Sequence, residues 1–186
     1  MKRHANSPIG AAEAMVNGNA CNDISHGAGG DTPLGRRAGN SAVFGRVCAN
    51  DVADWNTRVI DEFHAKRGKG IGSWGDNLLL LTTRGAKSGQ LRTTPLVYHR
   101  DGERYVIAAS KGGAPTHPGW YHNLVKYREA EIEVGIEKFK VRATPIPNGV
   151  ERDRLYEAHG DVFAGFRDYP KKTTRIIPVV VLERIR

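Results

Sequence analysis

From Leu78 onward the chain alternates short apolar segments with turn residues, and this pattern restricts the fold more than any other feature. Asp101-Gly102 is a strong hairpin signal, and Pro95, which cannot donate a hydrogen bond to a neighbouring strand, marks an edge or a bulge. The pattern lacks the regular strand–helix alternation of a doubly wound sheet. We therefore predict an α+β fold, mainly β, in which a small barrel carries packed helices. The expected strands are 78–83, 91–99, 104–110, 130–135, 138–146 and 175–185.

Three helices are expected around this barrel. Residues 51–67 have an apolar stripe at helical spacing and end in Lys66-Arg67, so this helix either packs on the core or also touches anionic lipid. Pro118 fits the first turn of a helix that runs to residue 127. Asn148 is suited to cap a third helix that continues to residue 160.

The chain divides into two unequal parts at about residue 50. Thirteen of the 14 aromatic residues lie in 51–186, whereas 1–50 hold eight glycines and no persistent periodicity. We predict a single domain in 51–186 and a poorly ordered or accessory segment in 1–50. The N-terminus has no apolar region typical of a secretory signal, so a cytoplasmic location is expected. Cys21 and Cys48 are interpreted as free thiols.

The net charge of +8 indicates an anionic partner. Nucleic acid, an anionic membrane surface and a phosphorylated small molecule all satisfy that condition. The basic residues gather in one turn and not along a stripe interleaved with exposed aromatic side chains, so nucleic acid is not expected. A small anionic molecule is favoured, and peripheral contact with an anionic membrane stays open.

The basic turn lies within residues 82–96, TTRGAKSGQLRTTPL. Arg84, Lys87 and Arg92 flank a strand–turn–strand, and Ser88 lies between two glycines. Glycines allow backbone amides to converge, and fixed cations beside such amides bind phosphate or carboxylate groups. The spacing differs from that of a P-loop. This segment predicts an anion cradle, with a charged turn that binds nothing as the alternative.

A second segment, 108–124, joins a strand to a helix. Ser110 and Lys111 end the strand, Gly112 and Gly113 follow, and Trp120 lies near the helix start. Glycines at a strand end let a planar ring approach the backbone, and a helix N-terminus attracts anions. The alternative is that Trp120 belongs to the core and Lys111 is solvated.

A third segment, 161–178, places Phe163, Phe166 and Tyr169 three residues apart. They are expected to form either part of the core or an apolar wall for a hydrophobic substrate. His117 and His122 lack the spacing and neighbours of a metal site, so no metal is expected. No pair of carboxylates or Ser–His–Asp arrangement points to hydrolysis.

Together, LTTRGAKSGQLRTTPL (81–96), ASKGGAPTHPGWYHNL (109–124) and RIIPVVV (175–181) resemble the deazaflavin-dependent nitroreductase family of actinobacteria. Its members are also described as quinone reductases that use reduced coenzyme F420. The resemblance runs from about Asp51 to the C-terminus. It implies a split β-barrel of the flavin-reductase-like kind and a hydride transfer from the deazaflavin to an electron-poor acceptor, such as a quinone or a nitro compound.

The resemblance also implies roles for individual residues. The cradle would hold the anionic tail of the cofactor, with Lys111, the 110–113 backbone and Trp120 near the ring. Ser110 would face the substrate, Tyr169 would line the acceptor pocket, and a proton would come from solvent or from a hydroxyl such as that of Tyr169. The residues implied in cofactor binding are Arg84, Lys87, Ser88, Arg92, Ser110, Lys111, Gly112, Gly113 and Trp120, and those implied in the substrate pocket are Phe163, Phe166 and Tyr169.

This chain departs from the better-known nitroimidazole-reducing members at three positions. Phe163 and Phe166 stand where those members have tyrosines, and Gly119 replaces a larger residue. A phenylalanine cannot donate the hydrogen bond of a tyrosine hydroxyl, so an apolar quinone is the favoured acceptor. Two alternatives remain: a split-barrel oxidoreductase that uses FMN, and a non-catalytic module that binds cofactor or lipid. If the protein makes peripheral contact with an anionic membrane, it would lie at the inner face of the plasma membrane.

Overall fold

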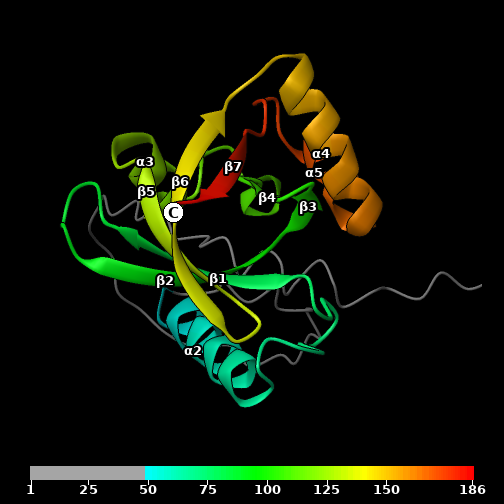
Figure 1. Ribbon diagram of the computed structural model, residues 1–186. Helices are drawn as coiled ribbons and strands as arrows, with labels where there is room; N and C mark the ends of the chain where they lie inside the picture. Colours follow the sequence, from blue (N-terminus) through cyan, green and yellow to red (C-terminus); the bar gives the residue numbers. More distant parts are fainter. Residues whose placement is uncertain (1–48) are drawn as a thin grey trace, which may run out of the picture.

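The computed structural model describes residues 49–186, with the backbone alone for 49–53. These residues form one curled sheet with helices around it (Figure 1). The strands are β1 (Leu78–Arg84), β2 (Leu91–Val97), β3 (His99–Asp101), β4 (Arg104–Ala108), β5 (Glu129–Val134), β6 (Glu137–Ile146) and β7 (Val179–Arg184). The helices are α2 (Ala49–Ala65), α3 (Gly119–Lys126), α4 (Val150–Val162) and α5 (Tyr169–Lys172), with short 3-10 turns η1 (Lys111–Gly113) and η2 (Ala164–Asp168).

A single residue connects the two edges of the curled sheet. The strand order is β2-β1-β5-β6-β7-β4-β3, and every neighbouring pair is antiparallel. The two edge strands, β2 and β3, are consecutive in the chain and are separated only by Tyr98. Because one residue spans only about 3.5 Å, a flat sheet of seven strands could not bring its two edges together in this way. The sheet must therefore curl until its edges meet at Tyr98, whose N–H donates to Asn77 O at 2.9 Å.

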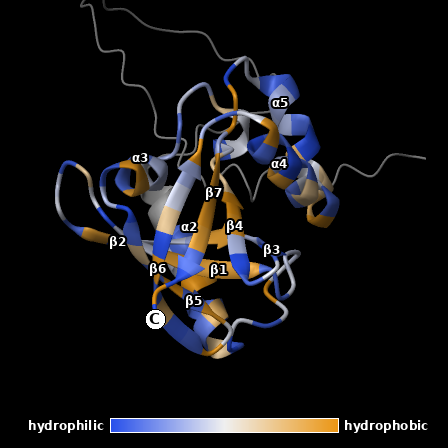
Figure 2. Cartoon of the chain, turned by 45° about the horizontal axis from the view of Figure 1, so that its top comes forward, coloured by the Kyte–Doolittle hydropathy of each residue, from blue (hydrophilic) through white to orange (hydrophobic). Residues whose placement is uncertain are grey.

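Apolar side chains from both halves of the sheet fill the barrel. Leu78 to Leu81 of β1 are all at most 1% exposed, so this uninterrupted apolar run is buried on both faces. In β6, buried and exposed residues alternate from Phe139 to Thr144, as expected for a strand with one face toward water. Strands β4 and β7 are hydrophobic along most of their length (Figure 2).

Each helix covers a different part of the barrel. Helix α2 contacts β2 and places Val59 and Phe63 in the core. Helix α3 packs near β1 and β6, and α4 packs on β3, β4 and β7. Helix α3 lies beside the turn between β1 and β2, far from α4 in Figure 1. The groove described below forms where α2, α3 and this turn meet.

The structure confirms the α+β barrel and corrects some details. Seven strands are present within 49–186, because the predicted strand 91–99 divides at Tyr98. Pro95 lies on edge strand β2, and Gly102 has a φ of 64° in the hairpin, both as predicted. The proposed cap of α4 is wrong: Gly149, with a φ of 97°, is the N-cap, and no side chain caps the helix.

Part of the sequence-based prediction falls outside the described residues. The accessory segment 1–50 lies there almost entirely, as do Cys21 and Cys48, so these predictions stay untested. Among residues 49–186, none of the helices combines the length and the apolar character needed to cross a bilayer.

Candidate functional site

A groove of about 750 Å³ lies between the β1–β2 turn, strand β2, helix α3 and helix α2. It is the candidate site because it brings together residues from distant parts of the chain. Three of the four cradle residues, Lys87, Ser88 and Arg92, line it together with Trp120. Its other lining residues are Asn56, Thr83, Gly85, Ala86, Thr94, Pro118, Gly119, His122 and Asn123.

The β1–β2 turn is held in a tight shape by its own hydrogen bonds. Gly85 N donates to Gln90 O and Gly89 N donates to Gly85 O, both at 2.8 Å. A Cβ at Gly85 would lie 2.5 Å from Ser88 Oγ, so only glycine fits there without displacing this hydroxyl. Gly89 has a φ of 71°, which also favours glycine. The two glycines therefore shape the turn, but their own N–H groups bond within it, and the convergence of backbone amides on an anion stays a prediction.

Helix α3 fixes the position of this turn. Asn123 Oδ1 accepts from Ala86 N at 2.8 Å, and Lys126 Nζ donates to Ala86 O at 2.7 Å. Asn123 Nδ2 also donates to Thr83 Oγ1 at 3.0 Å. Both polar groups of the Ala86 peptide backbone are thus bound by side chains of one helix. The distance between Lys87 and the α3 wall of the groove is set by these contacts.

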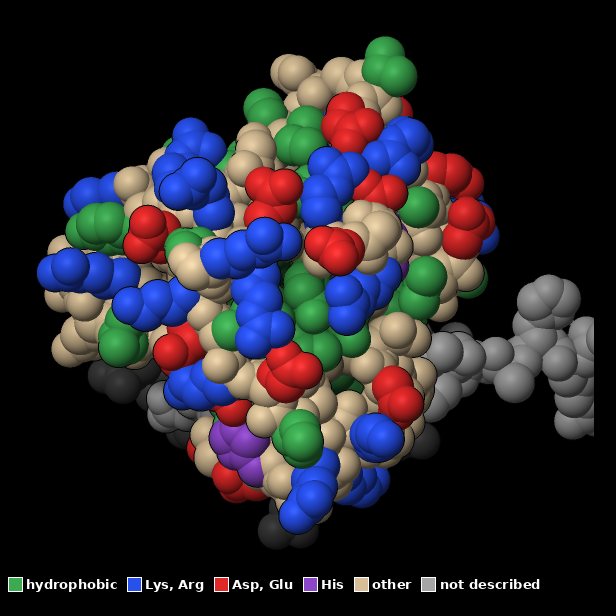
Figure 3. Space-filling view, in the orientation of Figure 1, with side chains coloured by type: hydrophobic (Ala, Val, Ile, Leu, Met, Phe, Trp, Pro, Cys, Tyr) green, Lys and Arg blue, Asp and Glu red, His purple; other side chains and the backbone are tan. Residues whose placement is uncertain are grey.

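Lys87 and Arg92 give the groove an unpaired positive charge. Among residues 54–186, neither forms an ion pair with an acidic side chain, in contrast to Lys66, Arg154 and Lys171. In Figure 3, lysine and arginine side chains are frequent on the side of the molecule that carries the β1–β2 turn. Unpaired cations of this kind attract phosphate and carboxylate groups.

Arg84, the fourth cradle residue, does not line the groove. Its guanidinium carbon lies 5.4 Å from the centre of the Tyr127 ring, and its side chain is exposed. Arg84 therefore contributes to the charge of the surrounding surface, and direct contact with a cofactor stays a prediction.

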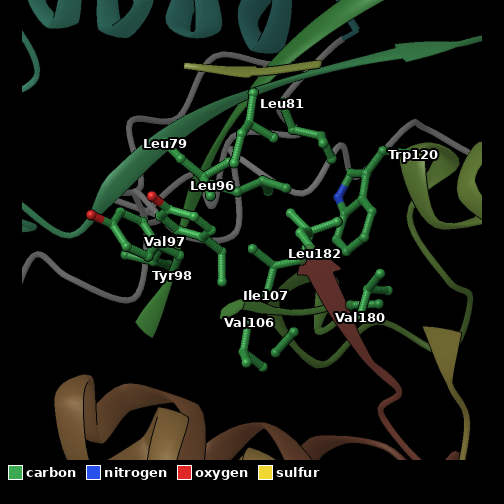
Figure 4. Close-up of a cluster of buried hydrophobic side chains, with 14 of the residues drawn as sticks. Leu79, Leu81, Leu96, Val97, Tyr98, Val106, Ile107, Trp120, Val180 and Leu182 are labelled. Atoms are coloured by element: carbon green, nitrogen blue, oxygen red, sulfur yellow. The ribbon is translucent and has the colours of Figure 1, made fainter. Parts of the chain in front are cut away.

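Trp120 belongs both to the groove and to the core. It is 4% exposed, and its ring lies among the buried side chains around Leu81 and Leu182 (Figure 4). Among the described residues, Trp120 Nε1 and Asn56 Oδ1 are buried without a hydrogen-bond partner. An unpaired donor and an unpaired acceptor at the wall of one groove are consistent with a polar ligand there.

The loop after β4 has an unusual backbone conformation. Lys111, Gly112 and Gly113 have φ values of 50°, 63° and 82°. A Cβ at Gly113 would lie 2.8 Å from Lys172 Cβ, so this glycine allows the loop to pack against α5. Burial, and to a smaller extent the nearby Arg175 charge, lower the pKa of Lys111. This loop lies outside the groove lining, and Ser110 is fully buried.

The third predicted segment forms part of the core. Phe166 and Tyr169 are each 2% exposed, their ring centres are 5.1 Å apart, and Phe163 is partly buried beside them. Tyr156 Oη donates to Phe166 O at 2.8 Å. None of the three aromatic residues lines the groove. Core packing accounts for Phe166 and Tyr169 as the structure shows them, and their contact with a substrate stays a prediction.

Two buried histidines face each other beside this aromatic cluster. His99 Nδ1 and His159 Nδ1 are 2.9 Å apart, so one imidazole donates and the other accepts. Burial, followed by the effect of His99, lowers the pKa of His159 to about 3. Within 49–186 no group of three or more histidine, cysteine or acidic side chains is arranged to hold a metal ion.

Three site residues were missed in the sequence. Asn123 ties the turn to α3, Asn56 brings α2 into the groove, and Arg175 donates four hydrogen bonds to the loop after β4. Asn56 and Asn123 have no distinctive sequence context. Arg175, in contrast, begins the RIIPVVV motif, which could have drawn attention to it.

A curled antiparallel barrel with a basic groove and a glycine-rich loop is the architecture of split-barrel, cofactor-binding oxidoreductases. A family model described as F420H(2)-dependent quinone reductase matches residues 55–184. The chain belongs to this family of oxidoreductases.

Individual relatives agree with this assignment. An F420H(2)-dependent quinone reductase of Mycobacterium tuberculosis (strain H37Rv) is 49% identical over 108 residues, covering 57% of this chain and 72% of the relative. A solved structure of an F420-H2 dependent reductase is 33% identical with a TM-score of 0.53, covering 57% of this chain and 94% of the other. A second solved structure, described as a domain-swapped dimer, is 31% identical with a TM-score of 0.55, covering 70% and 98%. The flavin-reductase-like split barrel is therefore confirmed.

Proposed function

We propose that this chain carries out the family reaction with the anionic tail of coenzyme F420 bound on Lys87 and Arg92. Membership of the family makes the chain an F420H2-dependent oxidoreductase with a quinone as hydride acceptor. The roles of individual side chains are our inference from the geometry of the groove.

The observation that carries the residue assignment is the unpaired charge of Lys87 and Arg92 in a groove that Trp120 also lines. The tail of the cofactor bears a phosphate and glutamates, which are the groups that a lysine and the planar fork of an arginine bind. Ser88 adds a hydroxyl, and the uncapped start of α3 adds the backbone N–H of Gly119, since Pro118 has none. The donor set therefore fits the tail of the proposed cofactor.

The chain itself supplies position and charge, and this agrees with the lack of an evident acid–base cluster. When bound, the cofactor supplies the hydride, which carries both electrons to the quinone. Lys87, Ser88 and Arg92 would hold the tail, while the 110–113 backbone and Lys111 would lie against the ring. The reduced acceptor then takes up a proton from solvent or from the Tyr169 hydroxyl. Holding donor and acceptor in contact lowers the barrier by several kcal/mol in comparable reactions.

An apolar quinone is a better acceptor for this chain than a nitroimidazole. Phe163 and Phe166 offer no hydroxyl to a nitro group, and both lie in an apolar cluster. Reduction of nitro compounds is therefore proposed as a weak side activity. The FMN alternative would place a shorter phosphate on the same cradle, and a non-catalytic carrier would bind the cofactor without oxidising it.

A cytoplasmic location with peripheral contact at an anionic membrane is a further proposal. Apolar quinones partition into bilayers, so an enzyme that reduces them benefits from binding to the membrane surface. The positive charge around the β1–β2 turn and the exposed Leu91 support this idea. Co-sedimentation with anionic vesicles, compared with neutral ones, would measure it.

Anaerobic oxidation of reduced F420 in the presence of quinones and nitro compounds tests the proposed function. We expect turnover with quinones, slow turnover with nitro compounds and binding of F420 in preference to FMN. FMN binding without deazaflavin binding would favour the FMN enzyme. Cofactor binding without oxidation by any acceptor would favour the carrier.

A further inference from the structure

Arg175 lies four residues before the start of β7 and is hydrogen-bonded to the loop that follows β4. Its Nε donates to Ala114 O at 2.7 Å, and its Nη2 donates to Ala109 O at 3.1 Å and to Ser110 O at 2.6 Å. Its Nη1 lies 3.0 Å from His117 Nδ1, which accepts because an arginine can only donate. One guanidinium thus contacts both ends of the loop 109–117.

The acceptors of Arg175 are all neutral, and the described residues provide no acidic partner for it. Burial lowers the pKa of Arg175, which nevertheless stays charged because arginine is protonated throughout the physiological range. A partly buried, unpaired charge is costly unless its hydrogen bonds are satisfied or an anion lies nearby. Lys111, on the same loop, adds a second cation.

The direction of these hydrogen bonds determines which backbone groups lie on the side of the loop that faces away from Arg175. In a trans peptide, C=O and N–H point in opposite directions, and the described residues contain no cis peptide bonds. Because Ser110 O points toward Arg175, the N–H group of Lys111 in the same peptide unit points away from it. A cation on the carbonyl side polarises this peptide unit and makes its N–H group a stronger donor.

The left-handed backbone of Lys111 needs support from its surroundings. A φ of 50° is uncommon for a residue with a side chain and costs about 1 kcal/mol or more. Arg175 bonds to the carbonyls of Ser110, just before Lys111, and of Ala114, just after the left-handed run. These bonds hold the ends of the strained turn in place.

We propose that Arg175 is a positioning residue for the ring-binding loop: it holds 109–114 so that the backbone N–H and the side chain of Lys111 face a planar ligand edge that carries carbonyl groups and negative charge. The inference rests on the proposed function and identifies this edge as the carbonyl-bearing edge of the deazaflavin ring. The anionic tail lies on a different set of residues, so ring binding and tail binding can be measured separately.

The test compares the complete cofactor with its riboside fragment, which has the ring but neither phosphate nor glutamates. Arg175→Met should weaken binding of both molecules by the same factor, at least about tenfold, because only ring contacts are lost. Arg175→Lys keeps the charge but loses the fork, so its affinities should lie between those of Arg175→Met and the unchanged protein. Lys87→Ala should weaken binding of the complete cofactor alone. Dissociation constants come from quenching of tryptophan fluorescence.

Arg152→Met is the matched control. Arg152 is also largely buried and donates to Ile177 O at 2.7 Å, two residues after Arg175, but it has no bond to the loop. This variant should lower stability without changing the affinity for the fragment. If Arg175→Met does not fold, the affinity of Arg175→Lys for the same fragment is compared with that of the wild-type protein instead.

Two results have different consequences. If the wild-type protein binds neither the cofactor nor the fragment, the proposed function is overturned, and this inference with it. If the wild-type protein binds the fragment and a folded Arg175 variant binds it equally well, only the positioning role is overturned. The absorbance of the bound ring, measured over a pH series, gives a second test. The anionic form of the ring should be less favoured when it is bound to Arg175→Met than when it is bound to Arg152→Met.

Discussion

At the scale of single residues, the buried histidine pair is the feature most sensitive to pH. His159 is fully buried, and its imidazole contacts Phe166 with 4.3 Å between ring centres. The pKa of His99 is also lowered, first by burial and also by Arg154, while Asp101 opposes the shift. Both imidazoles are thus neutral in the folded protein near pH 7. Their N–H···N bond joins β3 to α4.

Acid should destabilise the fold through this pair. In the unfolded chain histidine binds a proton below about pH 6.5, whereas folded His159 does so only near pH 3. The unfolded state therefore binds more protons between these values, and stability falls as the pH is lowered from 6.5 toward 3. His159 alone should cost about 2 kcal/mol between pH 6.5 and 5. Urea unfolding at several pH values measures this loss.

The His159→Phe variant should show a flatter pH dependence, because it removes the titrating group and keeps a planar ring beside Phe163 and Phe166. His122→Gln, at an exposed position of α3, serves as the control and should leave the dependence unchanged. An equally steep loss of stability in His159→Phe would contradict the assignment to this pair.

The cradle cations provide a second prediction at this scale. Lys87→Ala and Arg92→Ala should each weaken F420 binding by about 1.5–3 kcal/mol, because each removes a charge-assisted hydrogen bond. Turnover at saturating cofactor should change little. Lys171→Ala is a suitable control, since that lysine pairs with Asp168 away from the groove. Wild-type affinity in both cradle variants would refute the assignment.

The hydroxyl of Tyr169 provides a third prediction at the scale of single residues. Tyr169→Phe keeps the ring that packs on Phe166 and removes the hydroxyl alone. If the hydroxyl donates the proton, turnover should fall while cofactor affinity is kept. Steady-state rates against quinone at saturating F420H2 measure the change, and an unchanged rate would assign the proton to solvent.

At the scale of secondary structure elements, α3 links the two halves of the groove. Trp120 and Asn123 are three residues apart on this helix and therefore lie on the same face. Through Asn123 and Lys126 the helix holds the backbone of Ala86, next to Lys87. A helix is stiff over this length, so the cation and the tryptophan keep a fixed separation.

Asn123→Ala should loosen the turn without disturbing the core. The variant loses the bonds to Ala86 N and Thr83 Oγ1, and we expect F420 affinity to fall about fivefold to tenfold. Titration of the cofactor, together with the melting temperature, measures both effects. Val125→Ala, at a half-exposed position of the same helix, is the control. Equal affinities in the two variants would mean that the turn holds its shape without α3.

At the scale of the whole molecule, the sheet is curled so that the chain passes from one of its edges to the other across Tyr98. Every described strand pairing lies between Leu78 and Arg184. The core, the groove and the loop after β4 are all built from residues after 54. The described part of the chain thus contains a complete barrel.

A shortened chain that lacks residues 1–48 should therefore keep the barrel. We expect cooperative unfolding with a melting temperature within a few degrees of the full chain, because no described strand loses its partner. Calorimetry of the two proteins measures this. Loss of cooperative unfolding would show that the barrel depends on residues 1–48 and would refute the predicted division at about residue 50.

The sequence by itself determined most of the strands, the hairpin at Asp101-Gly102 and the position of the cradle turn, because period-2 patterns, glycine and proline act over a few residues. The motifs also carried the family resemblance. Only the tertiary structure decided that Tyr98 joins both sheet edges, that Arg84 lies outside the groove and that Arg175 supports a loop about 60 residues earlier in the chain. These features depend on how the sheet curls and which distant side chains then meet. Local sequence patterns do not encode such contacts, because each one depends on the packing of the whole barrel.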